Sequence, residues 1–358
     1  MSTGLADVVA AETVLSDVDG LAGRLVIRGL PLEALAGLRY EAVLHLLWQG
    51  FFDDLPEIEE FGARLGEARA AAFADWQVLA GLSPFDAVRA ALARQPDDTD
   101  LASALRLAAA PAVFLPAALR AERGLPAIAP DPALAHAADI LRMLTGRPAA
   151  GEQVDALDAY LVTVADHGLN ASTFAARVVA STQAGLMSAV LAAMGALKGP
   201  LHGGAPGPVL DMLDAIGTAD NAAPWIGASL ARGERLMGFG HRIYRVRDPR
   251  AEALQRALRL LRSSGNASIT RMDLAMQVET AALEALRQHR PERPLATNVE
   301  FYTALLLEAL GFPREAFTAV FAIGRTGGWI AHAREQALTG KLIRPRSLYV
   351  GPQPRQAA

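Results

Sequence analysis

The chain has 358 residues, and at about 150 residues per domain this length predicts about two domains. Hydrophobic residues make up 52% and charged residues 20%, which excludes a disordered protein and supplies a large core. The net charge of -4, with both signs interspersed, argues against nucleic acid or an anionic membrane as the main partner. Because cysteine is absent, disulfide scaffolds, thiolate metal sites and cysteine nucleophiles are excluded.

The N-terminal residues lack the basic start and apolar run of a signal peptide. The longest strongly apolar run, residues 107–119, is too short to span a bilayer and contains two prolines. We therefore expect a soluble cytoplasmic protein.

The first predicted element is a small hairpin, in which a strand at residues 25–27 follows a turn-like segment at 17–20. Most other segments predict helices, because alanine and leucine dominate and apolar residues recur at spacings of three and four. The clearest helical patterns fall at residues 40–48, 135–144, 211–216, 252–262 and 303–310. Gly146 and Pro148 end the second of these in the manner of a C-cap. The sequence predicts an all-α protein without a parallel sheet.

Several motifs of known chemistry are present only in part. Gly238-Phe239-Gly240 lacks the third glycine of a dinucleotide fingerprint, and residues 324–328 lack the Walker spacing and its lysine. Residues 202–205 resemble an esterase oxyanion loop, but the absence of G-x-S-x-G argues against a serine hydrolase. No histidine precedes a glutamate and no two lie three or four residues apart, so no metal site is predicted.

Four segments place polar residues where a helical core would not: 166–173, 199–204, 238–250 and 298–300, with Arg325 and Arg344 further on. Taken alone, a single histidine is more often structural, and Glu300 fits the first turn of a helix. Arg325 is harder to explain, because it is the only charge between residues 316 and 330 and a buried guanidinium requires an anion. Together, three histidines, one carboxylate and several arginines fit a dianionic carboxylate substrate and acid–base chemistry at carbon.

These segments resemble those of the citrate synthase family. Residues 199–205, Gly-Pro-Leu-His-Gly-Gly-Ala, resemble the segment around the family's first catalytic histidine, and residues 238–250 resemble the segment around the second. Further matches are the D-H-x-x-N-A-S-T stretch at 166–174, the N-V-D-x-x motif at 298–302, the C-terminal segment at 344–347 and the opening at 16–29. The resemblance covers nearly the whole chain in order.

The resemblance implies a mostly helical homodimer of the short type, without the extra N-terminal domain of hexameric relatives. A large domain would comprise residues 1–203 and 306–358, and a smaller, mobile helical domain would comprise residues 204–305. The active site would lie in the cleft between them and close on its substrate.

The resemblance also implies an acyltransferase of the tricarboxylic acid cycle that condenses acetyl-CoA with oxaloacetate and hydrolyses citryl-CoA to citrate and CoA. Glu300 would be the base, His202 would donate a hydrogen bond to the enolate oxygen, and His241 would polarise the ketone. Oxaloacetate would be bound by His167, Arg250, Arg325 and, from the partner subunit, Arg344. The coenzyme A site would be lined by Leu201, Gly203, Met237, Gly238, Phe239, Gly240 and Arg245. Neither a metal nor a permanently bound cofactor is required.

The chain departs from the family pattern at several positions. Glu300 replaces an aspartate, Pro206 stands where many members have asparagine, Gly168 where many have glutamate, and residues 82–86 lack a histidine before the proline. These positions bear on which acyl-CoA and 2-oxo acid are used. A 2-methylcitrate synthase acting on propionyl-CoA stays open, because one methylene is worth only about 1–3 kcal/mol. The other alternative is a non-catalytic scaffold that binds acyl-CoA or a partner protein, although binding alone would not need the base.

Overall fold

A computed structural model of the chain describes residues 8–77, 81–202, 206–240, 244, 248–265, 269–289, 291–292 and 295–352. Over these residues the fold is mostly helical, with one small sheet, which confirms the predicted all-α class. The α-helices are α1 (Leu32–Leu35), α2 (Tyr40–Trp48), α3 (Ile58–Ala74), α4 (Pro84–Leu92), α5 (Leu101–Glu122), α6 (His136–Thr145), α7 (Gly151–Val164), α8 (Ala171–Ala180), α9 (Leu186–Leu197), α10 (Gly207–Ile216), α11 (Ala222–Ala231), α12 (Pro249–Ser263), α13 (Ile269–His289), α14 (Val299–Ala309) and α15 (Phe317–Thr339). Two short 3-10 helices are η1 (Ala219–Asn221) and η2 (Arg314–Ala316).

The five helical patterns singled out from the sequence correspond to α2, α6, α10, α12 and α14. Gly146 follows α6 with a φ of +83°, so it is the left-handed C-cap that the sequence predicted.

One three-stranded antiparallel sheet lies in the described part of the chain, formed by β1 (Ser16–Asp19), β2 (Arg24–Ile27) and β3 (Leu30–Pro31). The predicted hairpin is confirmed. The predicted position of its turn, residues 17–20, was wrong, because residues 17–19 belong to strand β1 and pair with residues 24–26 of β2. Oδ1 of Asp19 accepts hydrogen bonds from the backbone N–H groups of Leu21 and Ala22. Asp19 therefore ends the strand and caps the turn that follows it.

The longest apolar run belongs to α5, which continues as a helix through Pro111 and Pro116. In length and composition α5 resembles a membrane span, but 83% of its most apolar stretch is buried inside the protein. Helices α3, α4, α6 and α15 pack around it. In this structure α5 is the central helix of the core.

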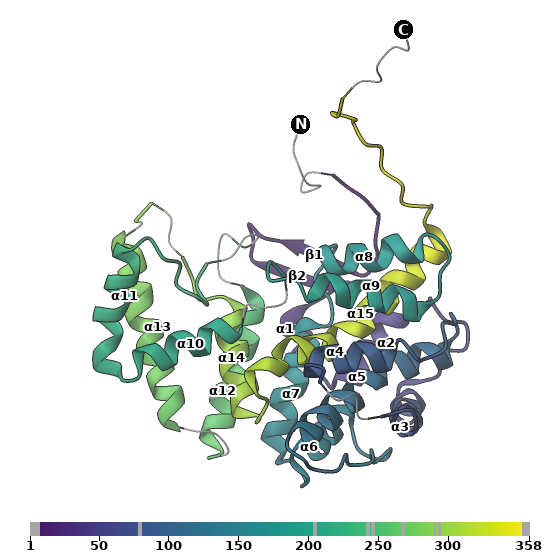
Figure 1. Ribbon diagram of the computed structural model, residues 1–358, viewed down its shortest axis with the longest axis horizontal. Helices are drawn as coiled ribbons and strands as arrows, with labels where there is room; N and C mark the ends of the chain where they lie inside the picture. The colour runs from purple at the N-terminus through teal and green to yellow at the C-terminus, as the bar shows by residue number, and fades with distance from the viewer. Residues whose placement is uncertain are drawn as a thin grey trace.

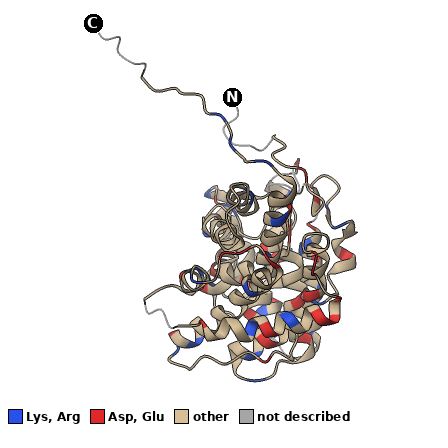
Figure 2. Ribbon diagram, turned by 90° about the vertical axis from the view of Figure 1, so that its right-hand side faces the viewer, with Lys and Arg blue, Asp and Glu red and all other residues tan. Residues whose placement is uncertain are grey.

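The helices gather into two groups (Figure 1). Helices α10 to α14 lie together on one side, and α15 runs through the other group in contact with α2, α5, α7, α8 and α9. Helices α12 and α14 contact α7, so the two groups meet there. Figure 2 shows acidic and basic residues mixed along the helices. The first and last described segments of the chain, near residues 8 and 352, lie on the same side of the body (Figure 1).

Two glycines allow α15 to approach α7 closely. A Cβ atom on Gly328 would lie 2.1 Å from the carbonyl oxygen of Ala165, and one on Gly324 would lie 2.5 Å from Cγ2 of Val164. Side chains at these positions would force the helices apart. The small residues of α15 therefore bring Arg325 against the C-terminal end of α7, where Val164 accepts its hydrogen bond.

Candidate active site

The loop between α7 and α8 carries His167, and the side chain of the preceding residue, Asp166, helps to fix this loop. The hydroxyl of Ser16 donates to Oδ2 of Asp166 at 2.5 Å and accepts the backbone N–H of Gly168 at 2.9 Å. Gly168 has a φ of +62°, a conformation that a larger residue adopts only with strain. His167 is buried, and its Nε2 lies 3.0 Å from the hydroxyl of Tyr244. The loop thus presents His167 in one fixed orientation.

His202 follows α9 and contacts the start of α8. Its Nε2 lies 2.8 Å from Oγ of Ser172, which also accepts a hydrogen bond from the indole N–H of Trp329 at 3.2 Å. Asn170 caps α8 by accepting the backbone N–H groups of Ser172 and Thr173. Burial, together with the positive charge of Arg325, lowers the pKa of His202 to about 4. The imidazole is therefore neutral at physiological pH.

Arg325 lies in the middle of α15 and is 1% exposed. Its Nε donates to the carbonyl oxygen of Val164, and its guanidinium carbon lies 4.7 Å from the centre of the Phe321 ring. Among the described residues it forms no ion pair with a carboxylate. Burial lowers the pKa of Arg325 to about 10, so it still carries its charge at neutral pH. A buried cation without an anion is a site for an anionic ligand.

Arg250 lies in the first turn of α12 and is also buried. Asp248 caps this helix and binds the guanidinium through both carboxylate oxygens, at 3.0 and 2.8 Å. The guanidinium also lies over the Tyr244 ring, 5.6 Å from its centre. The Asp-Pro-Arg sequence at 248–250 thus both starts the helix and fixes the arginine.

Glu300 lies in the first turn of α14, where its backbone N–H donates to the side chain of the capping Asn298. Asn298 is bonded in turn to the segment 238–240: its N–H donates to the Gly238 carbonyl and its side-chain amide to the Gly240 carbonyl. A Cβ on Gly238 would lie 2.9 Å from the Phe301 ring, so this glycine permits the close approach. The segment leading to His241 and the one leading to Glu300 are therefore one unit.

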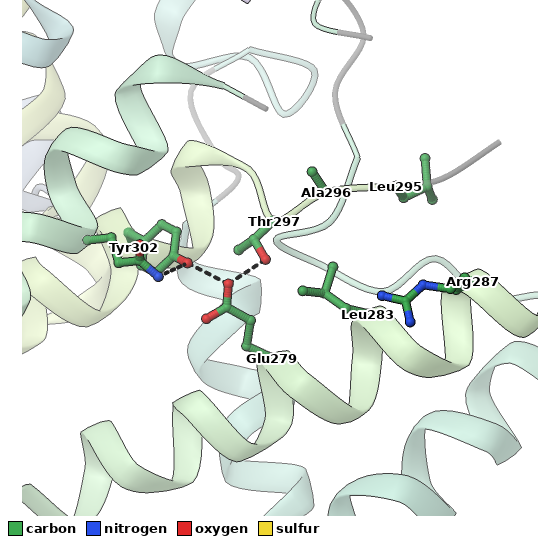
Figure 3. Close-up of a pocket in the computed structure, with 8 residues that line it drawn as sticks. Glu279, Leu283, Arg287, Leu295, Ala296, Thr297 and Tyr302 are labelled. Atoms are coloured by element: carbon green, nitrogen blue, oxygen red, sulfur yellow. Dashed lines mark hydrogen bonds between the residues drawn. The ribbon is translucent and has the colours of Figure 1, made fainter. Parts of the chain in front are cut away.

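A polar cluster supports this unit from the α13 side (Figure 3). Oε1 of Glu279 accepts hydrogen bonds from the hydroxyls of Thr297 and Tyr302, at 2.6 and 2.5 Å. Gln255 of α12 donates to the Tyr302 hydroxyl at 2.8 Å. These residues line a cavity of about 400 Å³ whose wall is the strand-like segment 295–297. Glu279 thus fixes the residues immediately before Glu300.

The charged groups of the site shift the pKa values of their neighbours. Burial raises the pKa of Glu300 to about 7, against the opposing positive charge of Arg250. Arg250 in turn contributes to lowering the pKa of Arg325, whose charge lowers that of His202. Electrostatic influence therefore links Glu300 to Arg250, Arg250 to Arg325 and Arg325 to His202.

The other predicted site residues lie in different environments: some in a paired segment, some exposed, and some outside the described residues. Met237, Gly238, Phe239 and Gly240 form the segment that pairs with residues 296–298, and Leu201 is fully exposed beside His202. Arg344 is exposed in the C-terminal segment that leaves the body of the chain (Figure 1). Gly203, His241 and Arg245 lie outside the described residues.

The sequence analysis missed several residues that hold the predicted ones. Ser172, Tyr244 and Asp248 contact His202, His167 and Arg250 respectively, and each lies inside a segment already singled out. Trp329 comes from a distant helix and carries no signal in the sequence. Within the described ranges, no group of three or more His, Cys, Asp or Glu side chains could hold a metal ion.

Comparison with known proteins identifies the family of the chain. The family description "Citrate synthase, C-terminal domain" matches residues 4–346. The chain belongs to the citrate synthase family. It is a citrate synthase-type enzyme, an acyltransferase that converts the acyl group into an alkyl group on transfer (EC 2.3.3).

Similar proteins within the citrate synthase family carry two different activities in their names. A "Putative citrate synthase 2" of Mycobacterium tuberculosis is 40% identical, over 98% of this chain and 93% of its own. A "2-methylcitrate synthase" of the same species is 38% identical, over 98% of this chain and 91% of its own. The structure is also similar to a ternary complex of Thermoplasma acidophilum citrate synthase with carboxymethyl coenzyme A and oxaloacetate, with a TM-score of 0.85, 29% identity and coverage of 99% and 97%.

Proposed function

We propose that this enzyme condenses acetyl-CoA with oxaloacetate and hydrolyses the resulting citryl-CoA to citrate and CoA. Helices α10 to α13 and the first part of α14 would belong to a mobile domain, residues 204–305, and the remainder of the chain to a large one. The cleft between them would close over the substrates and exclude water during the condensation.

The observation that carries this proposal is the pair of buried guanidinium groups, Arg250 and Arg325, beside a carboxylate whose pKa is raised to about 7. Arg325 has a buried charge and no carboxylate partner among the described residues. A dicarboxylate such as oxaloacetate supplies the missing anion, and its second carboxylate group can meet Arg250 or Arg344. His167, oriented by Tyr244, would contribute a further hydrogen bond to this substrate.

Glu300 would remove a proton from the methyl group of acetyl-CoA. A general base works best when its pKa lies near the operating pH, and burial raises the pKa of Glu300 to about 7. The base is then strong enough to attack a weak carbon acid, yet a useful fraction stays ionised at neutral pH.

His202 would stabilise the enolate oxygen that forms as the proton leaves. Because the pKa of His202 is lowered to about 4, the imidazole can donate a hydrogen bond as a neutral group. The hydroxyl of Ser172 donates to Oδ1 of Asn170, so Nε2 of His202 carries the N–H and donates it to Oγ of Ser172. In the proposed role the enolate oxygen would replace Ser172 as the acceptor of this N–H. The enolate carbon then attacks the ketone of oxaloacetate, which His241 would polarise, and water hydrolyses the thioester.

The coenzyme A thioester would lie along residues 237–240, with Leu201 and Gly203 beside it and Arg245 near a phosphate. The backbone of this segment is held by Asn298, next to the proposed base. A ligand bound there would therefore bring its acyl group to Glu300. No metal or resident cofactor takes part in these steps.

Release of CoA tests the proposal directly. We expect the thiol of CoA to appear with acetyl-CoA and oxaloacetate together and not with acetyl-CoA alone. Propionyl-CoA in place of acetyl-CoA tests the second candidate, 2-methylcitrate synthase, which the 38% identical relative supports. A higher kcat/KM with propionyl-CoA would establish that activity instead, and no release with either thioester would refute both.

We also propose that the protein is a homodimer in which Arg344 completes the site of the partner subunit. Arg344 is exposed and lies in a segment that leaves the body of its own chain. An Arg344→Ala variant and a Glu300→Gln variant should each be inactive, whereas each hybrid dimer should hold one intact site. This corresponds to about half of the wild-type activity per hybrid dimer and about a quarter in an equal mixture that has exchanged subunits at random. Verified hybrids that stay inactive would refute a shared site.

A further inference from the structure

The hydroxyl group of Tyr160 is buried and has no hydrogen-bond partner among the residues that the structure describes. Tyr160 lies on α7, one turn before Val164, whose carbonyl oxygen accepts the hydrogen bond from Arg325. An unpaired buried hydroxyl destabilises the folded state, and phenylalanine would fill the same space without that disadvantage. Packing alone therefore does not account for a tyrosine at this position.

A complementary group lies on the neighbouring helix. The carboxylate of Glu300, on α14, accepts no hydrogen bond within the part of the chain that the structure describes, and α14 packs against α7. After burial itself, the charge of Glu300 is the largest influence that raises the pKa of Tyr160. Among the described residues, the Tyr160 hydroxyl lacks an acceptor and the Glu300 carboxylate lacks a donor. The two groups are close enough to interact electrostatically.

The remaining charged groups around this pair are Arg250 and Asp248 at the start of α12 and Arg325 on α15. Asp248 already binds Arg250 through both oxygens. Both arginines are assigned to the carboxylates of the substrate, so Tyr160 is the neutral donor left for Glu300. Compared with aspartate, Glu300 has one more methylene with which to reach it.

We propose that Tyr160 is a positioning residue for Glu300, donating its hydroxyl proton to one carboxylate oxygen when the cleft closes. The other oxygen is then held toward the acyl methyl group. This inference rests on the proposed function of Glu300 as the base. The extra rotatable bond of glutamate makes such a restraint necessary, because small misplacements of a reacting group cost about a hundredfold in rate.

The test is Tyr160→Phe, which removes only the hydroxyl. The measurement is exchange of the acetyl-CoA methyl protons with deuterated water, in the presence of a non-reactive oxaloacetate analogue. We expect about a tenfold slower exchange with an unchanged KM for oxaloacetate. The acid limb of the pH profile should move up by as much as about one unit, because a lost donor disfavours the ionised carboxylate. The melting temperature should rise by about 1–3 °C.

Tyr40→Phe is the matched control, since the buried hydroxyl of Tyr40 donates to the carbonyl oxygens of Ile323 and Gly324. This variant should melt at a lower temperature and keep the normal pH profile. An unchanged exchange rate and profile in Tyr160→Phe, or a lowered melting temperature like that of the control, would overturn the inference. A wild-type protein that neither exchanges nor releases CoA would instead refute the proposed function itself.

Discussion

Two polar clusters each include side chains of α15, and they differ in how completely their groups are paired. The first cluster comprises Asp166, Arg177, His332 and Glu335, all of them buried. Arg177 donates to Nδ1 of His332 and to Glu335, and since arginine only donates, His332 carries its proton on Nε2 and donates it to Asp166. Every charge in this cluster meets a partner.

The second cluster comprises Tyr160, Glu300 and Arg325, and we call it open because polar atoms of these side chains lack hydrogen-bond or ion-pair partners among the described residues. Arg325 has no carboxylate partner, the Glu300 carboxylate accepts no hydrogen bond, and the Tyr160 hydroxyl is unpaired, all within the described residues. A closed buried network stabilises a fold, whereas an open one destabilises it until a ligand or a movement supplies the partners. The contrast separates structural charges from those that await a substrate.

The largest effect expected from breaking the open cluster is that of Glu300→Gln. It keeps the size of the side chain but removes the base, so exchange of the acetyl-CoA methyl protons should fall by about 10²–10⁴-fold. The substitution should not lower the stability of the folded state. Because the pKa of Glu300 is raised to about 7, its contribution to stability is full below about pH 4.5 and is lost as the pH rises through 7. Above pH 7 the variant should therefore melt at or above the wild-type temperature.

Glu308→Gln is the control on the same helix, since Glu308 pairs with Arg271 away from the site. It should leave exchange unchanged. Glu300→Asp should also slow exchange, by up to about a hundredfold, if the surrounding helices are fitted to the longer side chain. Equal exchange in wild type and Glu300→Gln would show that another group removes the proton.

A paired substitution sharpens the comparison between the clusters. Arg177→Met leaves Glu335 buried without its partner and should lower the free energy of unfolding by about 3–5 kcal/mol. Arg325→Met removes an uncompensated buried charge, so it should leave the melting temperature unchanged or raise it while raising the KM for oxaloacetate about 10- to 100-fold. Denaturant unfolding and steady-state kinetics measure the two effects. Equal destabilisation by both variants would make Arg325 a structural residue.

The sequence predicted the open cluster better than the closed one. Arg325 stood out because it interrupts an apolar run, and Glu300 because it replaces the aspartate of a recognisable motif. Arg177 and Glu335 lie among ordinary helical residues, so nothing local indicates that the fold brings them together across 158 positions. Tyr160 gave no signal either, because a buried tyrosine is unremarkable until its hydroxyl is found to lack a partner.

The fold was predictable at the level of class and of the strongest helices, since these follow from composition and periodicity. The hairpin turn was placed wrongly because Asp17 and Asp19, residues typical of turns, lie in strand β1. The extent of α5 was hidden by Pro111 and Pro116, which the packed core accommodates inside the helix. Tertiary contacts decided both cases, and no local pattern records them.

The smallest expected effect concerns Glu279, whose hydrogen bonds to Thr297 and Tyr302 fix the segment before Glu300 (Figure 3). Glu279→Gln replaces two charge-assisted hydrogen bonds from Thr297 and Tyr302 with weaker neutral ones. The segment 238–240, which is bonded to Asn298, should then be held less firmly. We expect kcat/KM for the acyl-CoA to fall about two- to fivefold, with the pH profile unchanged. Glu284→Gln, on the exposed side of α13, is the control that should change neither. A normal kcat/KM in Glu279→Gln would mean that the pairing of residues 238–240 with 296–298 suffices to place Glu300 without support from α13.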